Sequence, residues 1–264
     1  MTSRIMMVIE DYNWLSSHLD DPNIIVLDAR GNMPYRFAHI ENAIPLGLEY
    51  LVSIADNGAN VVIDANVAEE LFSKFGIDRS KAIIVYGENI DPTAARIVWT
   101  LMYHGHPNVK LLEIGFSHWA REGLAINKGT QVRTNSDSTH FSPQINSTIR
   151  ANEPMIRAKL RNPRTMIIDA RSAQEHLQAR IPGSVLHNWE EGVGSNGKMF
   201  KDKHELLNAF EQNGITKDKE VICYCHSGTR ASHLYLQLKE AGFQHVRLYD
   251  GSIIDWAQHR NPLR

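Results

Sequence analysis

Cys225 opens a short segment, residues 225–230, whose residue types suit sulfur and anion chemistry. It follows the apolar run Val221-Ile-Cys-Tyr and precedes a helical pattern that begins near Thr229. At such a junction, unpaired main-chain N–H groups and the positive end of the helix dipole converge. This setting favours the thiolate, which is the nucleophilic form of cysteine. The sequence therefore predicts a nucleophilic Cys225 held at the start of a helix.

The other residues of this segment suit the binding of a small anion, and we expect them to form a cradle around the sulfur. Gly228 permits a tight curl that turns successive N–H groups inward. Arg230 and His226 add positive charge at the rim, although histidine is only partly charged at neutral pH. Two alternatives stay open, namely that Arg230 joins strand to helix and that His226 is inert. The cradle comprises His226, Ser227, Gly228, Thr229 and Arg230.

The second cysteine, Cys223, lies inside the apolar run and is expected to pack in the core. The chain between the two cysteines is too short and stiff for an ordinary disulfide. A disulfide scaffold is therefore excluded, which fits a reducing compartment. A strand cannot bring Cys223, Cys225 and His226 together on one ion, so no metal site is expected.

The elements that position this segment occur twice in the chain. Both halves show short β-rich runs alternating with helical patterns, in the same order. The first half has Gly87 at the place of Cys225, in a loop with two acids and no nucleophile. The matching segments are 25–30 with 166–171, 38–44 with 179–185, 83–87 with 221–225, and 115–119 with 251–256.

Two α/β domains follow from this repeat, at residues 1–126 and 143–264. The polar segment 127–142 between them lacks an apolar period and is interpreted as a linker. Buried strands joined by helices predict a small parallel sheet in each domain, flanked by helices on both faces.

Each half should also contain one helix that starts at the loop after its central strand. In the first half, Asp91 can cap this helix and Pro92 can occupy its first turn. In the second half, Gly242 should end it. The apolar stripes are Ala95, Val98, Trp99 and Met102 in one helix, and Ala231, Leu234, Tyr235 and Leu238 in the other.

The composition is that of a globular protein, with 264 residues, 42% hydrophobic residues and a net charge of −2. This charge gives no general attraction to nucleic acid or to an anionic membrane. Acidic residues interrupt the short apolar run at the N-terminus, so neither a signal peptide nor a membrane span is expected there. We therefore expect a cytoplasmic protein that binds neither nucleic acid nor membrane.

The whole pattern resembles the tandem-domain rhodaneses, the thiosulfate and 3-mercaptopyruvate sulfurtransferases. The similarity covers nearly the full chain and implies two rhodanese-like domains, of which only the C-terminal one is catalytic. The segments that carry it are Asp169-Ala-Arg171, Arg180-Ile-Pro-Gly-Ser184, Phe200-Lys201, residues 225–233 starting Cys-His-Ser-Gly-Thr-Arg, and Leu248-Tyr-Asp-Gly-Ser252 with Trp256.

The resemblance also implies a double displacement that needs no cofactor. The Cys225 thiolate takes the outer sulfur of a small anionic donor, and the persulfide passes it to cyanide, to a thiol or to a protein acceptor. By the same likeness Arg171 and Arg180 are expected to bind the donor, although Arg171 could instead form a plain ion pair.

Three alternatives remain open at this level. His226 takes the basic position typical of thiosulfate enzymes, whereas Ser227-Gly228 copies the mercaptopyruvate pattern, and we expect thiosulfate. A cysteine phosphatase would need the longer spacing Cys-x5-Arg, and this loop has Cys-x4-Arg. A sulfur carrier in a relay, or a redox sensor, needs the same cysteine.

Overall fold

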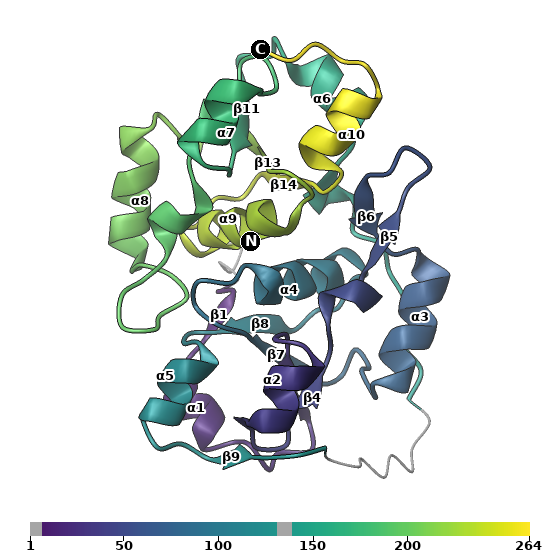
Figure 1. The fold of residues 1–264 in the computed structure, drawn as a ribbon, viewed down its shortest axis with the longest axis vertical. Helices are drawn as coiled ribbons and strands as arrows, with labels where there is room; N and C mark the ends of the chain where they lie inside the picture. Colours follow the sequence, from purple (N-terminus) through teal and green to yellow (C-terminus); the bar gives the residue numbers. More distant parts are fainter. Residues whose placement is uncertain (1–6, 131–138) are drawn as a thin grey trace, which may run out of the picture.

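The computed structural model describes residues 7–130 and 139–264, which form two α/β domains of the same plan (Figure 1). Each domain has a five-stranded sheet in which every strand pairing is parallel. The first sheet has the spatial order β1 (Ile9–Glu10), β8 (Val109–Leu112), β7 (Ala82–Tyr86), β2 (Ile24–Asp28) and β4 (Ile44–Pro45). The second has the order β10 (Arg150–Ala151), β14 (Val246–Tyr249), β13 (Glu220–Tyr224), β11 (Thr165–Asp169) and β12 (Val185–Leu186).

Helices cover both faces of each sheet, as predicted. In the first domain, α3 and α4 contribute to one apolar core, and α1, α2 and α5 to another. In the second domain, α8 and α9 pack on one side, and α6 and α10 on the other. The helices are α1 (Tyr12–Ser16), α2 (Asn32–Phe37), α3 (Ala65–Lys74), α4 (Thr93–Tyr103), α5 (Phe116–Arg121), α6 (Glu153–Lys159), α7 (Ala173–Gln178), α8 (Lys203–Gln212), α9 (Thr229–Glu240) and α10 (Ser252–Gln258).

Short elements complete the two domains. A hairpin of the first domain extends toward α10 of the second, where Asn57 donates a hydrogen bond of 2.5 Å to Asp255 (Figure 1). These elements are β3 (His39–Ile40) paired with β9 (Ile126–Asn127), the hairpin β5 (Val52–Ile54) and β6 (Asn60–Val62), and 3₁₀ turns at Leu48–Tyr50, Ser147–Ile149 and Trp189–Gly192.

The central strands β7 and β13 are buried along almost their whole length. Each reads as a continuous apolar run, because helices exclude water from both faces of a parallel sheet. Each central strand is followed by a loop and then by a long helix, α4 or α9. The repeat seen in the sequence is therefore a repeat of strand, loop and helix.

Helices α4 and α9 pack against each other at the centre of the molecule (Figure 1). The predicted apolar stripe of α9 is buried, and so are all the residues between its members, from Ala231 to Leu238. This wider burial arises because the sheet covers one side of α9 and the first domain covers the other. The two domains consequently share one continuous apolar core.

The helix boundaries agree with the prediction to within a residue. Helix α9 begins at Thr229, and Gly242, with φ of +90°, follows its C-terminal cap. Pro92 precedes α4 as its N-cap residue, one position earlier than expected. The Asp91 carboxylate accepts a hydrogen bond of 2.9 Å from the N–H of Thr93, which satisfies one free donor at the helix start.

The chain on both sides of residues 131–138 packs against the first domain. Those eight residues of the expected linker, and the first six of the chain, lie outside the described part. On the C-terminal side, Phe141 is buried against Phe72, and the N–H of Gln144 donates to the carbonyl of His104 over 2.9 Å. The domain limits at 126 and 143 stay a prediction, as does the cytoplasmic location. Within the described ranges, no helix combines the length and apolarity needed to cross a bilayer.

Candidate functional site

Cys225 lies directly after β13, at the carboxyl edge of the second sheet, and three residues before the cap of α9. Ligand sites of parallel α/β sheets form at this edge, where strands end and helices begin. The N–H of Gly228 donates a hydrogen bond of 3.1 Å to the Cys225 Sγ. The thiol is only 1% exposed, so it sits beneath the surface of the loop rather than on it. A sulfur anion here is therefore stabilised by at least one main-chain donor.

Glycine is required at position 228 for two independent reasons. Its φ of +90° lies in the left-handed region, where a side chain strains the backbone. A Cβ would also lie 2.6 Å from the carbonyl oxygen of Asp250 and 2.7 Å from Nη1 of Arg96. The curl that directs the Gly228 N–H at the sulfur thus depends on the absence of a side chain.

Ser252, at the first position of α10, supports the loop from the other side. Its hydroxyl accepts a hydrogen bond of 3.0 Å from the N–H of Cys225 and donates one of 2.8 Å to the carbonyl of Tyr249. The Ser252 Oγ lies 4.0 Å from the Cys225 Sγ. The Cys225 carbonyl in turn accepts the N–H of Ile253 over 3.2 Å. These contacts hold Cys225 in place at both ends of its peptide unit.

Ser252 belongs to one of the repeated segments but is not among the site residues predicted from the sequence. A usable signal was present in the repeat. Gly251 corresponds to Gly115, so Ser252 corresponds to Phe116, and only the half with the cysteine has a hydroxyl there. Ser252 also has φ of +56°, which a sequence does not reveal for serine.

Arg230 forms a bidentate ion pair with Glu175 of α7. Its two terminal nitrogens lie 2.7 and 2.8 Å from the two carboxylate oxygens. Hydrogen bonding from Arg230 lowers the pKa of Glu175 to about 2. The structure thus places Arg230 beside the loop with its charge balanced by an acid, and its predicted contact with substrate stays a prediction.

Arg171 is also paired, in a network that occurs in both domains. It donates to the two oxygens of Asp169 over 2.8 and 2.7 Å, and Tyr224 donates to the same carboxylate over 2.8 Å. In the first domain Arg30 donates to Asp28 in the same way, over 3.0 and 2.6 Å. Since a domain without the cysteine has the same pair, the pair stabilises the strand end independently of any thiol chemistry.

A pocket of about 450 Å³ lies beside the Cys225 loop. The exposed His226 lines it, together with Arg171, Glu175, Ile253 and Leu263. The side chain of Arg171 therefore combines its ion pair with a position at the pocket wall. This position is compatible with the predicted role of Arg171 toward an anionic donor, which stays a prediction.

The remaining predicted residues lie around the loop at different depths. Ser227 and Thr229 are half-buried, whereas Cys225 is buried. The Thr229 carbonyl accepts a hydrogen bond of 2.6 Å from the hydroxyl of Ser232. Arg180 lies farther along the chain after α7, where its guanidinium donates to the carbonyl of His176 over 3.2 Å. Its main chain pairs with Arg264 near the C-terminus.

Cys223 is fully buried in β13, and burial raises the pKa of its thiol. A neutral thiol in the core packs as a small apolar group, in line with the interpretation from sequence. Both cysteines are free. Among the described residues, no three His, Cys, Asp or Glu side chains converge where a metal ion could bind.

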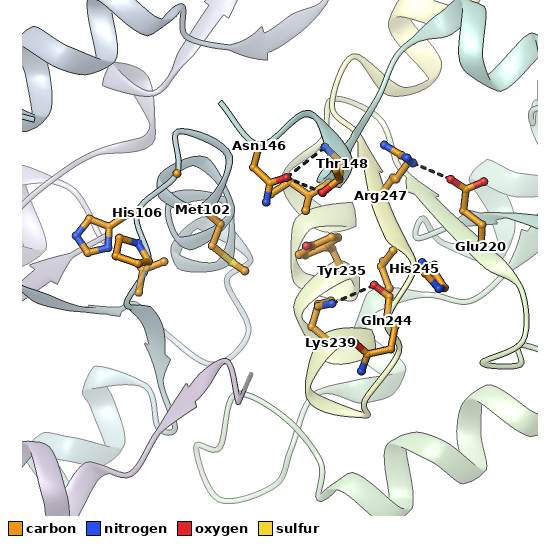
Figure 2. Close-up of a pocket in the computed structure, with 15 residues that line it drawn as sticks. Met102, His106, Asn146, Thr148, Glu220, Tyr235, Lys239, Gln244, His245 and Arg247 are labelled. Carbon is orange, nitrogen blue, oxygen red and sulfur yellow. Dashed lines mark hydrogen bonds and ion pairs between the residues drawn. The ribbon is translucent and has the colours of Figure 1, made fainter. Parts of the chain in front are cut away.

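A second cavity, of about 570 Å³, lies between the domains and is drawn in Figure 2. It lies at the amino ends of β13 and β14, the opposite edge of the sheet from Cys225. Glu220 and Arg247 at this edge form an ion pair of 2.7 Å, and Lys239 donates to the carbonyl of Gln244 (Figure 2). The cavity is therefore separate from the cysteine site.

Both domains of the chain match one known protein family. Residues 11–122 and 154–259 both match the Rhodanese-like domain. The sulfur carrier protein TtuD of Thermus thermophilus is 28% identical, over 94% of this chain and 93% of its own. A Mycobacterium tuberculosis protein named "Putative thiosulfate sulfurtransferase" is 29% identical, over 96% of this chain and 94% of its own.

Among solved structures, SseA of Escherichia coli, described as a 3-mercaptopyruvate sulfotransferase of rhodanese fold, superposes with a TM-score of 0.83. It is 26% identical, and the match covers 94% of this chain and 99% of that one. The family match over residues 154–259 includes the loop of Cys225.

Proposed function

Because the chain belongs to the rhodanese-like family through both of its domains, we propose that it is a thiosulfate sulfurtransferase acting through a persulfide on Cys225. The observation that carries the proposal is the 3.1 Å hydrogen bond from the Gly228 N–H to the Cys225 Sγ. A donor held at this distance stabilises the negative sulfur of a thiolate, and equally a negative terminal sulfur that replaces it.

In the first step the Cys225 thiolate attacks the outer sulfur of thiosulfate. A Cys–S bond to this sulfur forms, the sulfur–sulfur bond of thiosulfate breaks, and sulfite leaves with the electron pair. The enzyme is left as an anionic cysteine persulfide, so the negative charge stays at the loop. No proton, metal or redox cofactor enters the balance.

In the second step a thiophilic acceptor such as cyanide, or a thiolate, attacks the outer sulfur of the persulfide. The new bond forms to the acceptor, the sulfur–sulfur bond of the persulfide breaks, and the electron pair returns to Cys225 as thiolate. The substrate of the first step and the product of the second are both anions. A pocket lined by His226 and Arg171, next to the loop, supports the proposal that such anions bind there.

The first test is the intact mass of the protein after incubation with thiosulfate. We expect one added sulfur atom in the wild type and in Cys223→Ser, because Cys223 lies in the core away from the loop. Cys225→Ser should gain none. An unchanged mass of the folded wild type, or uptake by Cys225→Ser, contradicts the proposal.

A second candidate is a 3-mercaptopyruvate sulfurtransferase, favoured by the structural match to SseA. The persulfide would be the same. The carbon–sulfur bond of the donor would break, and pyruvate would leave as its enolate and take up the proton of the donor thiol. Steady-state rates with both donors, compared between the wild type and His226→Ala, separate the two. We expect a higher kcat/KM with thiosulfate and a loss in His226→Ala for that donor. A clear preference for mercaptopyruvate assigns the second function instead.

A third candidate is a persulfide carrier, favoured by the match to TtuD. A carrier takes up sulfur at Cys225 as the enzyme does but turns over slowly with small acceptors. Turnover of thiosulfate with cyanide, measured beside transfer to a protein thiol, distinguishes the two. We expect multiple turnovers with cyanide, and a single turnover followed by arrest assigns the carrier role.

A further inference from the structure

One arginine of the first domain, the domain at whose loop no nucleophile is found, lies against the Cys225 loop. Arg96 of α4 is completely buried, with its guanidinium over the ring of Trp99 at 4.9 Å. Within the described residues, none of its three guanidinium nitrogens has a hydrogen-bond partner. Leaving such donors unsatisfied costs free energy, so a charge nearby is needed to compensate them.

The guanidinium reaches across the domain interface to Gly228. A Cβ at Gly228 would lie 2.7 Å from Nη1 of Arg96, so this nitrogen is in contact with the glycine itself. The N–H of the same glycine donates to the Cys225 Sγ. Arg96 therefore lies against the peptide whose N–H binds the sulfur.

The acid nearest to Arg96 does not neutralise it fully. Asp250 lies 3.7 Å from Nη2 of Arg96, beyond hydrogen-bond distance. Asp250 already accepts a hydrogen bond of 2.8 Å from Arg150 and another of 2.8 Å from the N–H of Val62. Two arginines thus share one carboxylate, and one positive charge remains, since arginine stays protonated in proteins.

The other charged groups that face the loop are balanced among themselves. Burial lowers the pKa of Arg96, and negative charge on Asp250 and on Cys225 acts in the opposite direction. A negative sulfur at Cys225 would balance the positive charge that remains. The remaining groups are Arg230 paired with Glu175, Arg171 paired with Asp169, which also contacts His176, and the exposed His226.

We propose that Arg96 of the first domain is a positioning residue for sulfur transfer, its buried charge stabilising the sulfur anion of Cys225 through the Gly228 peptide. This inference rests on the proposed function for its role in turnover. It gives the domain without a nucleophile a chemical part, because the cation comes from α4 and not from the loop's own domain.

The test is the pH titration of the Cys225 thiolate by ultraviolet absorbance, with Cys225→Ser in the same background subtracted each time. In Arg96→Met the midpoint should rise by about one pH unit, since an opposite charge favours the ionised form. Arg96→Lys keeps the charge and should restore most of the shift. Thr100→Val is the matched control, because it alters a buried residue one turn along α4 without changing charge.

A second charge-removing variant guards against a packing defect in Arg96→Met. Arg96→Gln keeps a polar side chain and removes the charge, so its midpoint should also rise. A folded Arg96→Met whose titration coincides with the wild type overturns the proposal. If Arg96→Met does not fold, Arg96→Gln decides, and a midpoint that stays or falls overturns the proposal as well.

The titration needs no sulfur donor, so its outcome is distinct from that of the proposed function. If the midpoint rises in Arg96→Met as expected but the wild type gains no sulfur from thiosulfate, the sulfurtransferase proposal alone is contradicted. A wild type that gains sulfur at a rate unaffected by Arg96→Met, with an unshifted midpoint, contradicts the role of Arg96 alone.

Discussion

The N–H of Gly228 lies 3.1 Å from the Sγ of Cys225, and the same glycine fills a space in which no Cβ fits. The hydrogen bond and the missing side chain are parts of one arrangement. The loop can turn its amide toward the sulfur only with φ near +90°, in contact with Asp250 and Arg96 on its other side.

Gly228→Ala should therefore impair transfer more than it impairs folding. Removing a single anion-stabilising donor lowers rates by about 100-fold in other enzymes, and the strained backbone should cost about 1–3 kcal/mol. Sulfur uptake from thiosulfate under single-turnover conditions measures the first effect, and urea unfolding the second. Gly183→Ala is the control, because Gly183 also has positive φ but the Cβ site there has no close neighbour. Equal sulfur uptake by both variants contradicts the expectation.

Two replacements of Ser252 distinguish the effect of its hydroxyl from the effect of its backbone conformation. In Ser252→Ala the buried N–H of Cys225 loses its acceptor, which should cost about 1–3 kcal/mol of unfolding free energy. In Ser252→Gly the hydroxyl is lost too, but φ of +56° becomes unstrained, so the protein should be more stable than the alanine variant. Both should transfer sulfur more slowly than the wild type. A wild-type rate in either variant shows that the hydroxyl does not hold the cysteine in position.

The Arg230–Glu175 pair should stabilise the fold only above acidic pH. The pKa of Glu175 falls from its ordinary value near 4.5 to about 2 in the folded protein, so its stabilisation is present above 4.5 and is lost as the pH falls toward 2. Because the pair is partly exposed, we expect about 1 kcal/mol or less. Glu175→Gln keeps the N-terminal capping geometry of α7 and removes the charge. Urea unfolding at several pH values should show the two proteins converging near pH 2, and a gap that persists there contradicts this origin.

His233 should make the second domain sensitive to acid in a higher pH range. Burial within α9 lowers the pKa of His233 from 6.5 to about 3, so the unfolded chain binds a proton that the folded one does not. The contribution of the neutral His233 to stability is complete above pH 6.5 and should decrease as the pH falls from 6.5 toward 3. His233→Leu removes this contribution while leaving the other buried histidines unchanged. Parallel pH dependence of the two proteins is the result that contradicts it.

Much of the architecture could be predicted because it follows from local patterns. Continuous apolar runs specify the buried strands β7 and β13, and the 3.6-residue period specifies α4 and α9. The repetition of these patterns in one order specifies two domains of the same plan. The limits of α9 at Thr229 and Gly242 agree with the structure for the same reason, since helix ends depend on nearby residues.

Partnerships between distant segments could not be predicted in this way. Arg230 has the same place in the sequence whether it meets a substrate or an acid, and only the packing of α7 beside α9 brings Glu175 to it. The uniform burial of α9 likewise depends on a neighbour from the other domain, which the apolar stripe of a single helix does not specify.

The sequence by itself determined that Cys225 stands between a buried strand and a helix, in the half of a duplicated chain that has a nucleophile. Only the tertiary structure decided which groups surround the sulfur. Ser252 holds the Cys225 peptide from the next strand-to-helix connection, and Arg96 lies against Gly228 of the loop from the other domain. The physical reason is that strand and helix patterns are encoded within a few residues, whereas charge balance in a buried site depends on groups that meet only after folding.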